Sequence, residues 1–285
     1  KYGSGTYLTP AMRGSTVRVA MKILPALIVC LAGALSAHAK LVTQSVAYEQ
    51  GGVKLSGYLA YDDRQVGENR IPGILVVPEW WGLNDYVKGR AQQLAQLGYV
   101  AFVADMYGDG QSTTDAKKAG ALAGPFYGSP LMAERAQAGL DVLLKNKNVD
   151  PARVAAIGYC FGGSTVQALA YSGAPVAGIV SFHGGLIPVP ADAAAKTKAK
   201  LLICHGAMDP FTSKEALDTF IQAMNDGHFD YQFIMYAGAV HAFTNPEADQ
   251  AAAAGLKGVG YNAAADHRSW AHMKAFFAEI FAQKK

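Results

Sequence analysis

The sequence predicts an α/β fold with a mostly parallel central sheet flanked by helices. The first observation is a series of continuous apolar runs, such as 71–79 "IPGILVVPE" and 99–107 "YVAFVADMY". The second is that these runs alternate with stretches whose apolar residues recur at helical spacing. This combination is typical of a parallel sheet that is buried on both faces. A third observation adds an N-terminal antiparallel hairpin, because apolar and polar residues alternate on either side of Gly51-Gly52.

The predicted elements follow one another along the chain in an alternating order. After the hairpin and the strand in 71–79, a helix is expected where Val87, Ala91 and Leu94 share one face. The remaining expected elements are the strand in 99–107, a helix over 131–144, strand 153–159, a helix from Gly163, strands 176–184 and 200–206, a helix opening with the capping box 212–215, strand 230–238 and a terminal helix over 269–281. The alanine-rich segment 189–200 is expected to be a surface connection or a short helix.

Composition favours a globular protein with a large core. Of the 285 residues, 51% are hydrophobic and 16% are charged, which excludes a disordered chain. The net charge of +3 comes from lysines and arginines that are spread along the sequence. Nucleic acid is therefore not expected as a partner, because phosphate binding needs a clustered basic face.

A secretory signal peptide is predicted over residues 21–39. Met21 and Lys22 precede the apolar run "ILPALIVCLAGALSA", and "AHA" follows it, so cleavage is expected after Ala39. The run is shorter than the ~20 residues that span a bilayer, which argues against a stable membrane anchor. The interpretation is an upstream segment at 1–20, an exported protein that is periplasmic or secreted, and a single domain at 40–285.

The mature chain keeps two cysteines, Cys160 and Cys204. Because exported proteins meet oxidising conditions, a Cys160–Cys204 disulfide and a redox function are one alternative. Cys204 lies inside a predicted strand, where a buried and inert thiol is the simpler expectation. The absence of a C-x-x-C pair removes the main support for a thioredoxin-like function.

Ionisable side chains gather directly after the predicted strands. They are Glu79, Asp105, Cys160, His183, His205, Asp209 and His241. Open parallel sheets bind ligands beyond the carboxyl ends of their strands, so these residues are the candidates for a site. No Cys, His or Asp spacing among them suggests a metal site.

Cys160 is the candidate nucleophile. It stands in 158–163 "GYCFGG", where glycines relieve the steric conflict of a tight turn between a strand and a helix. The N-terminus of the following helix would favour a thiolate and then an oxyanion. In hydrolases with such a turn, an acid and then a histidine follow the nucleophile along the chain. Asp209 and His241 satisfy this order, whereas His183 and His205 are expected to line or support the pocket.

These motifs resemble those of the dienelactone hydrolases, a family of the α/β-hydrolase superfamily. The resemblance extends from about Leu41 to Gln283 through "VVPEWWGLNDY", "VADMYG", "IGYCFGGS", "SFHGGL", "GAMDP" and "HAFTNP". It implies an α/β-hydrolase fold with a mostly parallel central sheet. It also implies a triad of Cys160, His241 and Asp209, and a glutamate, Glu79, that interacts with the cysteine in the resting site.

The resemblance further implies an oxyanion hole, and the sequence departs from the family's pattern at two positions. The oxyanion hole would be formed by the backbone N–H groups of Phe161 and Trp80. The arginines that bind the carboxylate of dienelactone correspond to Asp109 and Asn245. Neither residue is basic, so the resemblance does not extend to this carboxylate site unless another arginine or the lysines near residue 117 replace these arginines.

The function expected from these observations is hydrolysis of an ester, lactone or thioester through a thioacyl intermediate, without a cofactor or a metal. The substrate is expected to be a small ester or lactone, with Trp81, Tyr107 and His183 forming part of its pocket. The protein is expected to be a monomer or a homodimer. The alternatives are a non-catalytic binding protein with the same fold, and a broad-specificity esterase or peptidase that resembles the serine enzymes.

Overall fold

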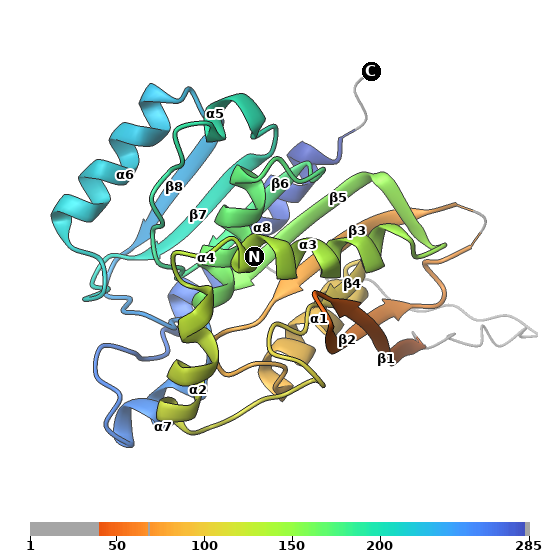
Figure 1. The fold of residues 1–285 in the computed structure, drawn as a ribbon, viewed down its shortest axis with the longest axis horizontal. Helices are drawn as coiled ribbons and strands as arrows, with labels where there is room; N and C mark the ends of the chain where they lie inside the picture. Colours follow the sequence, from red (N-terminus) through yellow and green to blue (C-terminus); the bar gives the residue numbers. More distant parts are fainter. Residues whose placement is uncertain (1–39, 68, 283–285) are drawn as a thin grey trace, which may run out of the picture. The chain divides into compact units, whose positions relative to one another are not determined.

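An eight-stranded sheet crosses the computed structural model, which describes residues 40–67 and 69–282 (Figure 1). The strand order is β1-β2-β4-β3-β5-β6-β7-β8. Strands β3 to β8 are parallel, and the hairpin of β1 and β2 joins β4 in antiparallel pairing. The strands are β1 (Leu41–Gln50), β2 (Val53–Asp62), β3 (Ile71–Val77), β4 (Val100–Val103), β5 (Val149–Tyr159), β6 (Gly178–Phe182), β7 (Lys200–Gly206) and β8 (Tyr231–Tyr236). The predicted fold class is confirmed.

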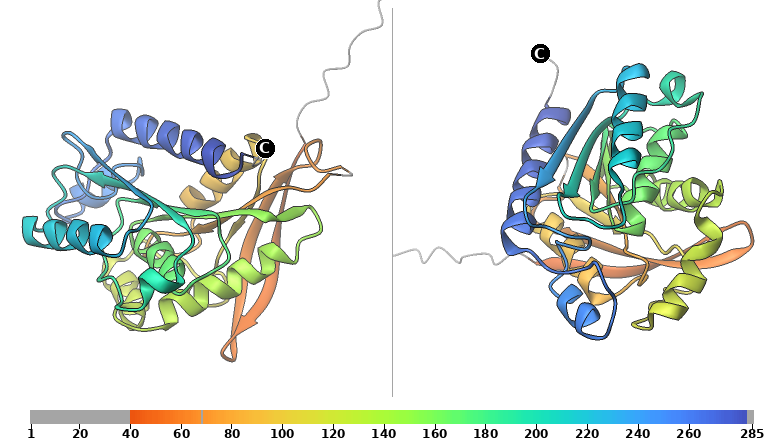
Figure 2. Two further views of the ribbon diagram at one scale, coloured as in Figure 1. Left: turned by 90° about the horizontal axis from the view of Figure 1, so that it is seen from above. Right: turned by 90° about the vertical axis from the view of Figure 1, so that its left-hand side faces the viewer.

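Helices cover both faces of this sheet. They are α1 (Asp85–Gln96), α2 (Ala116–Ala123), the 3-10 turn η1 (Gly124–Phe126), α3 (Leu131–Leu144), α4 (Phe161–Tyr171), α5 (Ala193–Lys196), α6 (Lys214–Asp226), α7 (Ala248–Ala253) and α8 (Ala263–Ile280). Helices α1 and α8 pack on one face of the sheet, and α3, α4 and α6 pack on the other (Figure 2).

The two cores explain why the parallel strands are apolar throughout. Alternate side chains of a strand point to opposite faces. In β3, Ile74 and Val76 therefore join the core under α1 and α8, while Leu75 and Val77 join the core under α3 and α4. All four side chains are fully buried. The same arrangement places the carboxyl ends of β3 and β5 to β8 at one edge of the sheet.

Several element boundaries differ from the sequence predictions. Helix α4 begins at Phe161, two residues before the expected Gly163, because the turn is confined to Cys160 alone. The capping residue of α6 is Ser213, whose side chain accepts from Ala216 N at 3.1 Å. Helix α8 begins at Ala263, six residues earlier than expected, because Asn262 caps it. The short helices α2 and α7 were not predicted.

The segment at 1–20 and the predicted signal peptide at 21–39 lie outside the described residues, so cleavage and export stay predictions. Within residues 40–67 and 69–282, none of the helices combines the length and the apolar character that a membrane span requires.

Candidate active site

Cys160 occupies a strained turn between β5 and α4. Its backbone has φ 53° and ψ −116°, a conformation that costs a non-glycine residue about 1–3 kcal/mol. Two neighbouring glycines make room for this turn. A Cβ on Gly158 would lie 2.0 Å from Gly162 O, and a Cβ on Gly162 would lie 2.2 Å from Val77 O. The glycines predicted to flank the turn are therefore required by close backbone approach.

Cys160, His241 and Asp209 form a continuous line of contacts. His241 Nε2 lies 3.0 Å from Cys160 Sγ, and His241 Nδ1 lies 2.8 Å from Asp209 Oδ2. Phe211 N donates to the other oxygen of Asp209 at 2.9 Å and fixes the orientation of the carboxylate. The structure thus brings together the three residues predicted as a triad, although they are separated by 49 and 32 positions in the chain.

The charges in this line favour a proton on His241. Burial by itself lowers the pKa of His241, but the negative charge on Cys160 and the contact with Asp209 outweigh it and raise this pKa to about 10. Burial also acts to raise the pKa of Asp209, and the hydrogen bond and charge of His241 reverse that effect, so the carboxyl has a lowered pKa. The contacts with Cys160 and Asp209 therefore favour the protonated form of the His241 imidazole.

Glu79 lies next to this line but contacts a different residue. It is 2% exposed, and its Oε2 accepts a hydrogen bond from Asn245 Nδ2 at 2.6 Å. Burial raises the pKa of Glu79 to about 7, although the Asn245 hydrogen bond and the charge of His241 act in the opposite direction. In the described part of the chain, Glu79 forms a hydrogen bond to Asn245 and none to Cys160, and the interaction with the cysteine that the resemblance implied stays a prediction.

Two backbone N–H groups without a hydrogen-bond partner among the described residues belong to Phe161, the residue after Cys160, and to Trp80, the residue after Glu79. Phe161 N belongs to the first residue of α4, where helical N–H groups have no partner within the helix. Trp80 is held by its carbonyl oxygen, which accepts from the Tyr107 hydroxyl at 2.9 Å. These are the two donors that were predicted for an oxyanion.

A cavity of about 1070 Å³ opens over Cys160 and His241. Its aromatic lining consists of Trp80, Trp81, Tyr127, Phe161 and Phe211. Its acidic lining consists of Glu79, Asp85 and Glu247, and none of the described lining residues is a lysine or an arginine. The cavity therefore combines apolar walls with acidic side chains, and Cys160 is part of its lining.

A sequence model of the dienelactone hydrolase family matches residues 55–281. The chain belongs to the dienelactone hydrolase family. A relative in Bradyrhizobium sp, named probable 2-oxo-3-(5-oxofuran-2-ylidene)propanoate lactonase, is 29% identical over 216 residues, which are 71% of this chain and 86% of the relative. Members of this family are hydrolases of esters or lactones, and the chain is one of them.

Solved structures agree with this assignment. The dienelactone hydrolase-like promiscuous phosphotriesterase P91, from metagenomic libraries, is 39% identical, with a TM-score of 0.80 over 85% of this chain and 99% of P91. A second structure, m3DLH, is 38% identical with the same TM-score and the same coverage. The match thus covers nearly the whole of P91 and of m3DLH.

Two residues that were predicted to line the pocket of this family member lie beside the cavity instead. Tyr107 packs against Phe126 and Phe161 and holds the Trp80 carbonyl. His183 is fully buried, and its ring contacts the Cys160 backbone and Thr244. Neither is among the described lining residues. Position directly after a strand could not distinguish a side chain that faces the cavity from one that packs beneath it.

The two positions where arginines were expected have different surroundings. Asp109 is exposed in a turn with φ 50° and does not line the cavity. Asn245 lines the cavity and is 3% exposed; besides its bond to Glu79, its Oδ1 accepts from Glu247 N at 2.9 Å. Because Asn245 follows His241 by four residues, the sequence indicated a position near the candidate site. Nothing in the sequence indicated that Asn245 would bind Glu79.

The geometry does not support the alternative of a disulfide between Cys160 and Cys204. Both described cysteines are free. Residue 182 of β6 pairs with Tyr159 on one side and with Cys204 on the other, so two strand spacings, roughly 10 Å, separate Cys204 from the end of β5. A disulfide needs Cα atoms closer than about 7 Å. Among residues 40–67 and 69–282, no group of three His, Cys, Asp or Glu side chains could hold a metal ion.

Proposed function

We propose that this dienelactone hydrolase family member cleaves uncharged esters, lactones or thioesters of carboxylic acids with Cys160 as the nucleophile. The observation that carries the proposal is the line from Cys160 Sγ through His241 to Asp209, at 3.0 and 2.8 Å, on the wall of a large cavity. A thiol beside a histidine that a carboxylate orients is the arrangement of covalent acyl transfer.

Acylation begins from a proton that has moved from Cys160 Sγ to His241 Nε2. The thiolate sulfur attacks the carbonyl carbon, and the carbonyl π electrons move to oxygen, where the free N–H groups of Phe161 and Trp80 stabilise the negative charge. The tetrahedral intermediate re-forms the carbonyl and breaks the bond to the leaving oxygen or sulfur. His241 gives its proton to this leaving group, and Asp209 keeps the imidazole in the correct orientation.

Deacylation uses the same residues in the reverse roles. Neutral His241 takes a proton from a water molecule as the water oxygen attacks the thioester carbon. The C–S bond then breaks, the carboxylic acid leaves, and the proton on His241 again balances the Cys160 thiolate. Because the pKa of Glu79 is about 7, both its protonated and its ionised form are populated near neutral pH.

The charge of the cavity supports uncharged substrates. Glu79, Asp85 and Glu247 line it, none of the described lining residues is a lysine or an arginine, and the protonated imidazole of His241 is already engaged by Asp209 and Cys160. Lys117, one of the lysines considered as a replacement for the arginines, lines a smaller adjoining pocket of about 410 Å³. An anionic acyl group that sits at Cys160 would meet carboxylates rather than Lys117.

Phosphotriesters are a second candidate class of substrate. P91, which is 39% identical to this chain, carries the name of a promiscuous phosphotriesterase. A phosphotriester is uncharged, and attack by sulfur at phosphorus would develop negative charge on an oxygen, as attack at a carbonyl does. The aromatic lining of the cavity is compatible with such apolar ligands.

The test compares 4-nitrophenyl butyrate with the mono-4-nitrophenyl ester of succinic acid, a related acyl group with a carboxylate, and adds one phosphotriester. Wild type is expected to hydrolyse the butyrate with a kcat/KM at least about tenfold higher than the succinate. Cys160→Ala is expected to be inactive toward all three, whereas Cys204→Ala, the matched control at the fully buried thiol, keeps its activity. Activity in Cys160→Ala would exclude Cys160 as the nucleophile. Equal kcat/KM values for the two esters would exclude the preference for uncharged substrates.

A further inference from the structure

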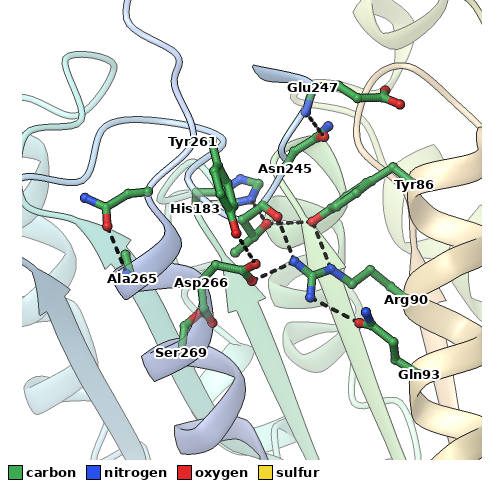
Figure 3. Close-up of polar contacts among 12 residues, drawn as sticks. Tyr86, Arg90, Gln93, His183, Asn245, Glu247, Tyr261, Ala265, Asp266 and Ser269 are labelled. Carbon is green, nitrogen blue, oxygen red and sulfur yellow. Dashed lines mark hydrogen bonds and ion pairs between the residues drawn. The ribbon is translucent and has the colours of Figure 1, made fainter. Parts of the chain in front are cut away.

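A buried polar network links four segments of the fold (Figure 3). It contains Tyr86 and Arg90 of α1, His183 at the end of β6, Thr244 in the loop after His241, and Asp266 of α8. All of these except Tyr86 are less than 9% exposed. The mechanism proposed above uses none of them.

His183 connects this network to the backbone of the nucleophile. Its Nδ1 accepts a hydrogen bond from Cys160 N at 3.1 Å, and the same N–H also reaches Phe182 O at 3.0 Å. His183 has φ 41°, so it shares with Cys160 a backbone conformation that is rare outside glycine. The bond therefore joins two strained residues on neighbouring strands and opposes relaxation of either one.

The hydrogen-bond partners fix the proton on the His183 ring. Because Cys160 N–H can only donate, Nδ1 must accept, and the proton of the neutral ring resides on Nε2. Nε2–H then donates to Thr244 Oγ1 at 2.7 Å, and the Thr244 hydroxyl lies 2.6 Å from the Tyr86 hydroxyl. Burial, with the nearby charges of His241 and Arg90, keeps the pKa of His183 well below its ordinary value. A neutral ring of one tautomer results.

Thr244 in turn is anchored on its other side. Arg90 Nη2 donates to Thr244 O at 2.7 Å and to Asp266 Oδ1 at 2.6 Å. Thr244 follows His241 by three residues and directly precedes Asn245, which binds Glu79. A single threonine therefore ties the loop that carries the base to the ring that holds the nucleophile.

We propose that His183 is a positioning residue, whose Nδ1 holds the Cys160 N–H so that Sγ stays within reach of His241 Nε2 and Phe161 N stays directed at the oxyanion. The inference rests on the proposed function of Cys160. His183 touches no reacting atom and exchanges no proton during turnover. It acts by setting the relative position of the nucleophile and the base, where an error of about 1 Å can lower a rate about 100-fold.

Two amide substitutions separate the two ring nitrogens. In His183→Asn the side-chain oxygen can replace Nδ1 and accept from Cys160 N, while the bond to Thr244 is lost. In His183→Gln the amide can replace Nε2 and reach Thr244, while the Nδ1 acceptor is lost and Phe182 O is the remaining acceptor of Cys160 N. We expect His183→Asn to lower kcat about threefold, and His183→Gln to lower it about 10- to 100-fold with KM nearly unchanged. Alkylation of Cys160 by iodoacetamide should slow in the same order.

Control variants separate positioning from packing. His205 is also buried at the end of a strand, but it is not among the described residues that line the cavity, where it had been expected. Its Nδ1 has no partner among the described residues, and no hydrogen bond joins it to the triad. His205→Gln should therefore leave kcat within about twofold. Equal losses in His183→Gln and His183→Asn, or in His183→Gln and His205→Gln, would overturn the positioning role.

A double-variant cycle keeps the test valid if His183→Gln does not fold. Thr244→Val removes the hydroxyl with little change of shape and is expected to lower kcat about threefold. Because His183→Asn already lacks the bond to Thr244, the double variant should be no slower than either single variant, whereas multiplied losses would contradict the link. Persisting activity in Cys160→Ala would instead refute the proposed function, so the two failures are distinguishable.

Discussion

The substitution Glu79→Gln is expected to make the protein more stable above neutral pH. Glu79 is 2% exposed, and its pKa in the folded protein is about 7 compared with an ordinary value of 4.5. Glutamine has nearly the same shape, and its oxygen can still accept the hydrogen bond that Asn245 donates at 2.6 Å. The change therefore removes a buried negative charge and little else.

The magnitude follows from proton linkage. A raised folded-state pKa means that the folded protein binds this proton more tightly than the unfolded chain does, so the free energy of unfolding falls as pH rises from 4.5 through about 7. The gap between these values, at about 1.36 kcal/mol per pH unit, corresponds to about 3.4 kcal/mol. Glutamine does not ionise, so the advantage of the variant should be about 1 kcal/mol at pH 5 and about 3 kcal/mol at pH 8.5.

Equilibrium unfolding in urea at pH 5 and pH 8.5 measures this difference directly. Glu247→Gln is the matched control, because it removes an exposed carboxylate from the same cavity, and its effect should stay within about 0.5 kcal/mol at both values. An advantage of Glu79→Gln that does not grow between the two pH values would show that burial does not oppose ionisation of Glu79.

Two further predictions concern the charges around the site. Asp209→Asn removes the carboxylate that helps to hold the pKa of His241 at about 10, so this pKa should fall and kcat should drop about 10²- to 10⁴-fold; a pH–rate profile identical to that of wild type would contradict this. Arg90→Met leaves Asp266 buried without its partner at 2.6 Å and should lower the free energy of unfolding by about 3–5 kcal/mol. A loss below about 1 kcal/mol in urea unfolding at pH 7 would exclude a stabilising role for this ion pair.

Backbone strain is concentrated around the candidate site. Cys160, His183 and Ala242 all have positive φ, and all follow or lie close to the ends of parallel strands. Cys160 and His183 are each held by a contact from a neighbouring strand end, because Cys160 N donates to His183 Nδ1 and His183 N donates to Cys204 O. Backbone strain of this kind persists only where the surrounding structure determines it strongly, and it concentrates at functional sites.

The sequence by itself determined the fold class and selected the candidate triad. Continuous apolar strands alternating with amphipathic helices can be buried only in a layered parallel sheet, and such a sheet brings its strand ends to one edge. Cys160, Asp209 and His241 could therefore be selected by position and chain order alone, and the structure places them in contact. This reasoning works because it needs only the strand ends and no knowledge of side-chain direction.

Only the tertiary structure decided what the neighbouring polar residues do. The order of strands places β6 between β5 and β7, which brings His183 beneath Cys160 and keeps Cys204 away from it. The loop after His241 determines that Asn245 binds Glu79. These contacts join residues 23 to 166 positions apart, and a hydrogen bond forms only within about 3 Å. Their formation depends on strand order, loop path and side-chain rotamers, which local sequence patterns do not encode.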